Sequence, residues 1–262
     1  MSARLPAFIR GPSGLGQETS STPAAAETTS SPAGQRDDAK RNFLKSMRPL
    51  PLQHYWDVYF DGPAKPADGE QQQQQQQQPP QSGDSQQSSQ LQKIGDQVES
   101  VQDFWRYSNN LPVAQMRMRD AIYLFKSGFR PVWEDRRNIL GGSWTFRVSK
   151  DVGPAFWTRI QLLAIGETLQ DAIGSSDQIC GVGISVRFNA HLVTIWNRDS
   201  FNKKSVDALI ACVLAELPPE LQPKPDSYYY KRHAERAGFA PPPELRAVLE
   251  SQLKAEAAVA KA

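Results

Sequence analysis

The chain contains several short segments with the pattern of β-strands, and these constrain its fold more than any other feature. In residues 55–60 and again in 144–149, large apolar side chains alternate with a second set of side chains. A repeat of two residues is that of a strand with two different faces. The sequence therefore predicts strands in four places: 55–60, 121–126, 144–149 and 180–197.

The longest of these segments, 180–197, is predicted to be a hairpin. We expect a turn at Asn189-Ala190, which would set Gly183 opposite Trp196 and Arg187 opposite Leu192. One face is then apolar and must be core: Val182, Ile184, Val186, Phe188, Val193 and Ile195. The other carries Gly181, Gly183, Ser185, Arg187, Thr194 and Trp196. It is either a ligand-facing wall with Arg187 available for an anion, or an exposed face along which Arg187 extends.

Three segments have the features of helices. Ser100 to Asp103 resembles a capping box, and a short helix bearing Phe104 and Trp105 is expected after it. Pro154 fits the first turn of a helix that is apolar nearly all round and reaches about residue 173. Apolar residues repeat at helical spacing over 206–217. Trp105 is either a core residue or an anchor for a partner helix.

Low-complexity sequence divides the chain. Residues 1–45 are rich in Ser, Thr, Pro, Gly and Ala, and they are predicted to be disordered. Residues 46–240 form the predicted domain, which a flexible insertion rich in Gln, Ser and Pro interrupts at 61–92. This insertion includes the unbroken glutamine run 71–78. Residues 241–262 are predicted to be a tail with a frayed helix over 244–261.

Composition excludes several classes of protein. The net charge of the 262 residues is +2, which argues against a protein that coats nucleic acid electrostatically. No apolar run is long enough to cross a bilayer, and the N-terminus lacks a secretory signal pattern. Cys180 and Cys212 lie far apart, and we interpret them as small apolar residues in a reducing compartment, with a disulfide as the alternative. The expected location is the cytoplasm, with the nucleus as an alternative.

Trp133 and Glu134 form a pair that suits one kind of ligand. The face of an indole ring attracts a cation, and the adjacent carboxylate can accept two charge-assisted N–H bonds. The pair would therefore fit a flat cation with N–H groups along one edge. The alternative is a Trp in the core beside a solvated Glu-Asp turn. Downstream, the basic aromatic segment 228–236 either closes over an anionic ligand or is a solvated loop.

Together these pieces resemble the eukaryotic translation initiation factor 4E family, which binds the 7-methylguanosine cap of messenger RNA. The matching pieces occur in the family's order at 51–56, 101–105, 124–128, 131–135, 141–144, 156–157, 165–167, 180–181, 186–188 and 195–197. The resemblance covers residues 49–236 apart from the insertion. The pairs Arg187-Phe188 and Trp196-Asn197 look most like the class II branch, the 4E homologous proteins, of which some repress translation.

The resemblance implies an α+β fold, in which three helices back the convex face of a curved antiparallel sheet and the ligand cleft lies on the concave side. It implies that Trp133 stacks on the methylated guanine, that Glu134 accepts from its N–H edge, that Trp196 lies by the N7-methyl group and that Arg187 meets the phosphates. Further phosphate contacts are expected from Lys231, Arg232 and Arg236. No metal, cofactor or membrane is implied.

The same resemblance implies a protein partner on the convex side. Family partners present a Tyr-x-x-x-x-Leu helix, as an initiation factor 4G-like scaffold or a 4E-binding repressor does. The matching surface positions in this chain are Pro51, Val101, Trp105, Leu162 and Gly166.

Three departures from the family predict weakened cap affinity. The first cap-stacking aromatic would fall at Gln87 or Ser88, with no aromatic nearby unless one of the tyrosines 228–230 moves in. Phosphate-binding lysines are replaced at Asn189 and Leu192, and Phe239 stands where a Lys is usual. Losing one stack and two charges should cost at least tens of fold in affinity, since each ~1.4 kcal/mol is about tenfold.

The predicted function is a non-catalytic, cap-binding translation regulator of the class II kind. The alternative is an interaction module on the same fold that has lost cap binding and acts through the surface around Trp105. An enzyme ranks third, because the three histidines His54, His191 and His233 are scattered without a paired nucleophile or metal spacing.

Overall fold

The structure, a computed structural model, describes residues 36–37, 40–41, 48–63 and 89–259. The chain separates into two units, Met1–Arg48 and Pro49–Ala262. Of the predicted disordered tail 1–45, only 36–37 and 40–41 are described, and they are helical and exposed. The rest of that prediction, and the glutamine run, lie outside the described residues.

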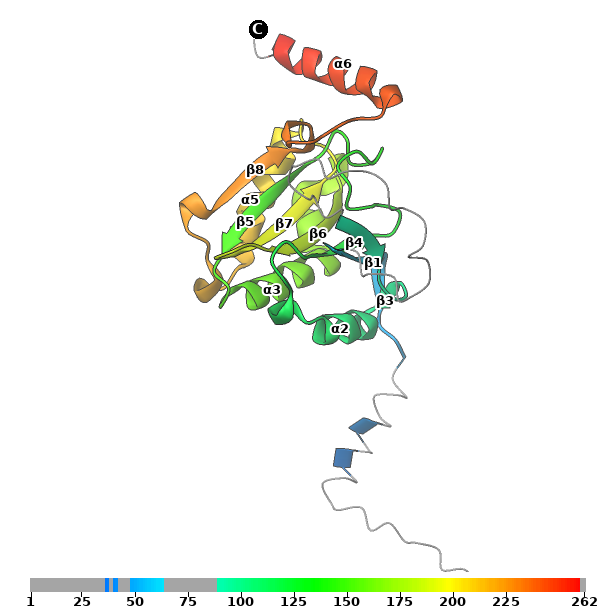
Figure 1. The fold of residues 1–262 in the computed structure, drawn as a ribbon, viewed down its shortest axis with the longest axis vertical. Coiled ribbons are helices and arrows are strands. Elements are labelled where there is room, and N and C mark those ends of the chain that lie inside the picture. The colour runs from blue at the N-terminus through cyan, green and yellow to red at the C-terminus, as the bar shows by residue number, and fades with distance from the viewer. Residues whose placement is uncertain (1–35, 38–39, 42–47, 64–88, 260–262) are drawn as a thin grey trace, which may run out of the picture. The chain divides into compact units, whose positions relative to one another are not determined.

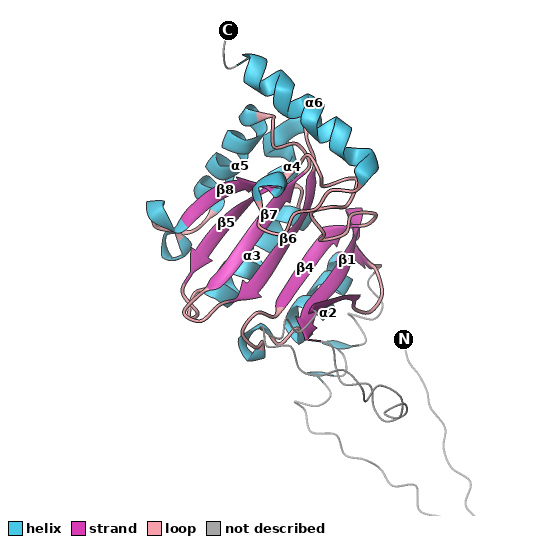
Figure 2. Ribbon diagram, turned by 45° about the horizontal axis from the view of Figure 1, so that its top comes forward, coloured by secondary structure: helices cyan, strands magenta, loops and turns pink. Residues whose placement is uncertain are grey.

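The second unit is built on one antiparallel sheet, drawn in Figure 2 with helices behind it. The strand order is β2-β1-β4-β6-β7-β5-β8, and β3 pairs with β1. The strands are β1 (Pro51–Pro63), β2 (Ser89–Lys93), β3 (Val98–Ser100), β4 (Ala121–Lys126), β5 (Gly142–Val148), β6 (Ile179–Val186), β7 (His191–Asn197) and β8 (Tyr228–Arg232). The predicted α+β class with a curved antiparallel sheet is confirmed.

Four helices of the described chain pack on one face of this sheet, which we call the helix-covered face (Figure 1). They are α2 (Val101–Asn110), α3 (Gly153–Ile165), α4 (Thr168–Ile173) and α5 (Lys203–Glu216). The last helix is α6 (Pro243–Val259), and short 3-10 turns lie at Val113–Gln115, Gly174–Ser176, Pro219–Leu221, Pro225–Ser227 and His233–Glu235. None of the helices in the described ranges is long and apolar enough to span a membrane.

The predicted helix over 154–173 is two helices, so the expected set of three becomes four. The break falls at Glu167, whose backbone is left-handed with φ of 60°. Its carboxylate accepts hydrogen bonds from Lys126 Nζ at 2.8 Å and from His54 Nδ1 at 3.0 Å. The turn therefore brings a buried acid to strand residues that carry its partners, which a continuous helix would not do.

Side-chain alternation gives the sheet two apolar faces. The helix-covered face holds the main core, which includes Trp56, Phe146 and Ile195 from the strands. The opposite face, which we call the site face, carries a smaller cluster: Tyr59, Phe125, Phe129, Cys180 and Trp196, with Leu91, Tyr123 and Trp133 packed against it. Cys180 and Cys212 are both free thiols.

The predicted register of the hairpin is wrong by two residues. Val186 pairs with His191 and Gly181 with Trp196, so the loop holds four residues, 187–190, and Arg187 N–H donates to Ala190 O. A shift by two keeps every strand residue on its predicted face, because side chains alternate with a period of two. Phe188 is moved out of the strand, however, and is 78% exposed instead of being core.

The predicted bounds of the insertion were too wide. Residues 61–63 complete β1, and residues 89–93 form β2, which pairs with 59–63 of β1. β2 lies at the edge of the sheet, where it is held by backbone pairing with β1 and by Leu91, which packs against the site-face cluster. The predicted C-terminal helix is α6, and it is tied to β8 by an ion pair between Arg232 and Glu256.

Candidate functional site

The floor of the site face is aromatic. Trp196 of β7 is 4% exposed, and its ring packs edge-on against Tyr123 and Phe125 of β4. A Cβ at Gly181 would lie 2.3 Å from the Phe125 ring, and one at Gly183 would lie 2.5 Å from Tyr123. These glycines thus admit the two β4 rings that support Trp196.

Trp133 reaches this floor from the loop between β4 and β5. Asn138 is fully buried, and its side-chain amide donates to Arg130 O at 2.6 Å and to Val132 O at 2.9 Å. Arg137 donates to Gly128 O, and its guanidinium lies over the Phe129 ring. These bonds fix the loop backbone on either side of Trp133, which is partly buried against the floor cluster.

A C-terminal segment, residues 233–240, lies against both tryptophans. The ring centroids of His233 and Trp196 are 4.3 Å apart, and His233 is fully buried. The Arg236 guanidinium carbon lies 5.3 Å from the centre of the Trp133 ring, and its Nη2 donates to Ser143 Oγ at 2.6 Å. We call residues 233–240 the C-terminal strap.

The strap also contacts the acid beside Trp133. The backbone N–H of Ala240 donates to Glu134 Oε1 at 3.4 Å. Trp133, Glu134 and Trp196, which the sequence predicted to act together, are thus all in contact with one segment. That segment thus contacts the groups that were expected to hold a ligand.

Burial perturbs the ionisable groups of the site. Desolvation, with a smaller contribution from the Arg236 charge, lowers the pKa of His233 to about 3, so its ring is neutral at pH 7. Desolvation raises the pKa of Tyr123 to about 12, while Arg187 and Arg236 oppose that rise. Burial lowers the pKa of Arg236, which stays a cation.

The four predicted phosphate contacts divide between the two faces. Arg187 is exposed in the β6–β7 loop, and Nη1 donates to Val186 O at 3.0 Å. Lys231 pairs with Ser143 in β5 and so shares the site face with it. Arg236 lies over Trp133, as described above.

Arg232 does not belong to this set. Because β8 alternates, its side chain points away from Lys231, pairs with Glu256 and lies over the Phe201 ring at 4.6 Å. Its predicted role as a phosphate contact therefore has no support in the geometry.

The position of the missing stacking aromatic, Gln87 or Ser88, lies outside the described residues. Among the three tyrosines that were considered as substitutes, Tyr228 packs on Phe146 and Tyr230 donates to Asn197 Oδ1, so both are committed to other contacts. Tyr229 is 49% exposed, shares the site face with Lys231, and influences the pKa of Arg236. It is the tyrosine of the three that faces the site.

Hydrogen bonds connect the elements that carry the predicted partner positions. The Val101 N–H donates to Leu50 O, beside Pro51, and His54 in the same strand bonds Glu167, next to Gly166. Trp105 is 38% exposed, which excludes the reading of it as a core residue. Leu162 is partly buried on α3.

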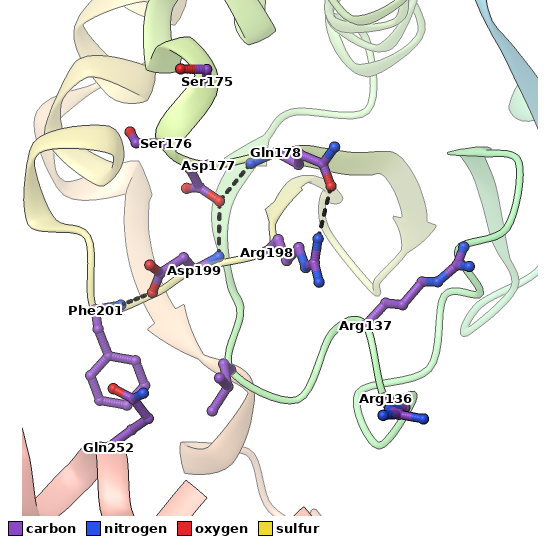
Figure 3. Close-up of a pocket in the computed structure, with 11 residues that line it drawn as sticks. Arg136, Arg137, Ser175, Ser176, Asp177, Gln178, Arg198, Asp199, Phe201 and Gln252 are labelled. Carbon is purple, nitrogen blue, oxygen red and sulfur yellow. Dashed lines mark hydrogen bonds between the residues drawn. The ribbon is translucent and has the colours of Figure 1, made fainter. Parts of the chain in front are cut away.

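A pocket of about 440 Å³ lies at the far ends of β6 and β7 from Arg187, and Figure 3 shows the residues that line it. Arg136, Arg137 and Arg198 line it, together with Asp177 and Asp199. Arg198 donates to Gln178 Oε1, and the Asp177 carboxylate accepts from Asn197 and from two backbone N–H groups, of Gln178 and Asp199. Most of its charges are thus already bonded within the protein.

Sequence reasoning missed three residues that build the site: Tyr123, Asn138 and Ser143. Tyr123 could have been found as the aromatic on the outward face of the strand 121–126. Asn138 and Ser143 carry no such signal, because their roles depend on loop geometry and on the strap. Within the described ranges, no group of three or more His, Cys, Asp or Glu side chains could hold a metal ion.

The chain is similar in sequence to known proteins. The rice (Oryza sativa subsp. japonica) "Eukaryotic translation initiation factor NCBP" is 38% identical over 121 residues, which are 45% of this chain and 51% of that protein. The zebrafish (Danio rerio) "Eukaryotic translation initiation factor 4E-1A" is 27% identical over 195 residues, 72% of this chain and 78% of that protein. The match to the plant NCBP proteins thus spans about half of their length.

Solved structures share the fold. The C. elegans eIF4E-3 in complex with the 4E-binding protein Mextli and a cap analog has a TM-score of 0.54 at 22% identity, covering 72% of this chain and 95% of that one. A sequence profile of eukaryotic initiation factor 4E matches residues 51–243, which include the sheet, its helices and the strap. The chain therefore belongs to the eukaryotic initiation factor 4E family.

Proposed function

We propose that this protein binds the 7-methylguanosine cap of messenger RNA and regulates translation initiation. The observation that carries the proposal is that Trp133, Glu134 and Trp196 all lie on the site face and contact one segment, the C-terminal strap. The C. elegans relative was solved with a cap analog, and an Ascaris suum eIF4E-3 that is 25% identical was solved with the m2,2,7G cap. The proposal is that this chain binds the same kind of ligand, the methylated cap.

The chemistry of recognition follows from charge and shape. Methylation at N7 gives guanine a positive charge, which strengthens its attraction to the Trp133 ring face. Glu134 then accepts from the N–H edge of the base, and its negative charge favours the same cationic form. Arg187 and Lys231, on the open side of the floor, would meet the phosphates. Each base–aromatic stack contributes about 1–3 kcal/mol.

The affinity of this chain for the cap is proposed to be lower than is usual in the family. With Gln87 and Ser88 at the position of the first aromatic, the base has one large plate instead of two, unless Tyr229 supplies the second. The class II branch, in which some members repress translation, fits the pairs Arg187-Phe188 and Trp196-Asn197. Action in the cytoplasm, where translation occurs, is part of this proposal.

Titration with 7-methyl-GTP and with GTP, followed by tryptophan fluorescence, tests the proposal. The wild type should bind 7-methyl-GTP more tightly, and Trp133→Ala should weaken this binding by about 10-fold to 100-fold. Trp105→Ala, which removes a Trp from the opposite face, is the matched control and should bind as the wild type does. If wild type and Trp133→Ala bind equally poorly, with no preference for the methylated base, the proposal is wrong.

A second candidate function is that of an interaction module without cap binding. It is favoured by the exposure of Trp105, which is flanked by Val101 on α2 and faces solvent. A helix with the pattern Tyr-x-x-x-x-Leu would cover this surface, as a 4G-like scaffold or a 4E-binding repressor does. The relative in complex with Mextli carries a 4E-binding protein.

A labelled Tyr-x-x-x-x-Leu peptide distinguishes the two candidates. Trp105→Ala should reduce peptide affinity about 30-fold or more, since buried aromatic anchors contribute about 2 kcal/mol or more at interfaces. Trp133→Ala is the control and should leave peptide binding unchanged. Peptide binding without any 7-methyl-GTP binding would favour the interaction module over the cap-binding protein.

A further inference from the structure

The C-terminal strap contacts the groups that a base would contact. Arg236 lies over the Trp133 ring and donates to Ser143, and Ser143 pairs with Trp196 across β5 and β7. The guanidinium therefore lies against one tryptophan and beside the strand position opposite the other. Under the proposed function, this is where the methylated guanine would lie.

The strap also resembles the ligand chemically. A guanidinium is a flat cation with N–H groups on its edges, as N7-methylated guanine is, and it is attracted to an indole face for the same reason. The Ala240 N–H on Glu134 supplies a donor for the carboxylate that would otherwise accept from the base. Arg236 thus gives Trp133 a flat cation, and Ala240 gives Glu134 an N–H donor. These are the two features by which a cap would be recognised.

The closed strap is incompletely satisfied. Both ring nitrogens of His233, and Nε of Arg236, are buried without a hydrogen-bond partner among the described residues. Buried polar groups normally have partners, and leaving one unpaired is unfavourable. Opening the strap would let these unpaired groups bind water, which favours the open form. The contacts with Trp133 and Glu134 favour the closed form. A segment that a ligand can displace needs such a balance.

The geometry of the chain allows the strap to open while its ends stay in place. Before it, Arg232 is held by Glu256 and Phe201. After it come Pro241 and Pro242, and α6 begins at Pro243. Within it, Gly238 has a φ of 85° with no neighbouring atom within 4 Å of where a Cβ would be. A small residue with free space at this position can change its backbone angles without disturbing the fold.

We propose that the strap 233–240 is an intramolecular competitor of the cap, with Arg236 as its principal contact. This inference rests on the proposed cap-binding function. Because only the open form can bind, the observed dissociation constant is the intrinsic constant divided by the fraction of molecules that are open. Removing the Arg236 contact therefore increases affinity, whereas a phosphate contact at Arg236 would have the opposite effect.

Two variants of Arg236 separate these roles in titrations of the full chain with 7-methyl-GTP. Arg236→Ala should bind about 5-fold to 10-fold more tightly than the wild type, from the loss of one cation–π contact and its hydrogen bond. Arg236→Lys keeps the charge but loses the flat fork, and should also bind more tightly. Arg106→Ala, which removes an exposed arginine from α2, is the charge-matched control.

The outcomes are distinguishable. Weaker binding by Arg236→Ala, with Arg236→Lys close to the wild type, makes Arg236 a phosphate contact and overturns the competitor while leaving cap binding intact. Unchanged affinity in both variants overturns the competitor as well. If no form binds 7-methyl-GTP and Trp133→Ala changes nothing, the proposed function and this inference fail together.

Hydrogen exchange provides an independent readout. The amides of His233, Arg236 and Phe239 donate to Gly141 O, His233 O and Arg236 O, and that of Ala240 donates to Glu134. Saturating 7-methyl-GTP should speed exchange at the amides of Arg236, Phe239 and Ala240, because the ligand displaces the strap. Slower exchange at these amides would mean that the strap closes over the ligand, and would overturn the proposal.

Discussion

Two buried polar clusters on opposite faces of the sheet differ in how completely they are paired. On the helix-covered face, Glu167 and Lys126 are 6% and 7% exposed, and the carboxylate is bonded to both Lys126 and His54. On the site face, His233 is fully buried with neither ring nitrogen bonded within the described chain. Paired groups define one structure, whereas unpaired ones mark a place where another molecule's groups can enter.

The largest expected effect comes from breaking the paired cluster. Glu167→Gln leaves the Lys126 ammonium buried without its counter-charge, which typically costs about 3–5 kcal/mol. The free energy of unfolding, measured by urea denaturation, should fall by about that amount. Glu216→Gln is the matched control, because Glu216 pairs with Arg159 at the surface and such pairs contribute about 0–1 kcal/mol. Equal losses in the two variants would contradict the comparison.

The unpaired cluster should respond to acid instead. Because the pKa of His233 is about 3 in the closed strap and ordinarily 6.5, protonation favours any form in which the ring reaches water. The stability of the closed strap is thus complete above pH 6.5 and is lost as pH falls toward 3. At pH 5.5 the loss is about 1.4 kcal/mol, or about tenfold in the open fraction. Arg236 is the charged group that contributes to this shift, and the ring neighbour, Trp196, is uncharged.

Amide exchange at strap residues, corrected for the intrinsic effect of pH on exchange, measures this opening. It should increase about tenfold between pH 7.5 and 5.5 in the wild type. His233→Gln, which has no group that titrates in this range, should lose the increase. A wild-type profile that is flat over this range would show that the strap stays closed when His233 is protonated, against the comparison.

A smaller effect on 7-methyl-GTP affinity is expected when two basic residues on opposite faces of β8 are removed in turn. Arg232→Ala removes a cation that points away from the site, so 7-methyl-GTP affinity should stay within about twofold of the wild type. Lys231→Ala, one residue earlier on the site face, should weaken binding by a few fold through the loss of one partly screened charge. A larger loss in Arg232→Ala than in Lys231→Ala would reverse the assignment of the two faces.

The sequence predicted the elements that depend on local patterns. Period-two alternation located β1, β5 and the β6–β7 hairpin, and the capping box at Ser100 starts α2, where its hydroxyl accepts from Asp103 N–H at 3.1 Å. Trp133 and Glu134 were identified from their chemistry, since a cation-binding plate beside a carboxylate is visible in two adjacent residues.

What the sequence did not predict depends on contacts between distant residues. The break at Glu167 brings its carboxylate to Lys126, which lies 41 residues earlier in the chain. The position of Arg236 over Trp133 depends on how the strap folds back over β5, and no local pattern records that. The polar strand β2 was assigned to the insertion, because an edge strand is held by backbone pairing that leaves little trace in composition.

The smallest expected effect tests the corrected register of the hairpin. If a two-residue turn placed Phe188 in the core, Phe188→Ala would cost about 3–5 kcal/mol of unfolding free energy. In the four-residue loop the side chain is 78% exposed, so the loss should be below about 0.5 kcal/mol. Val186→Ala is the control, because Val186 is 4% exposed and pairs with His191, so its truncation creates a cavity and should cost more. Urea denaturation of both variants decides the register. Only the four-residue loop predicts that Val186→Ala loses more unfolding free energy than Phe188→Ala does.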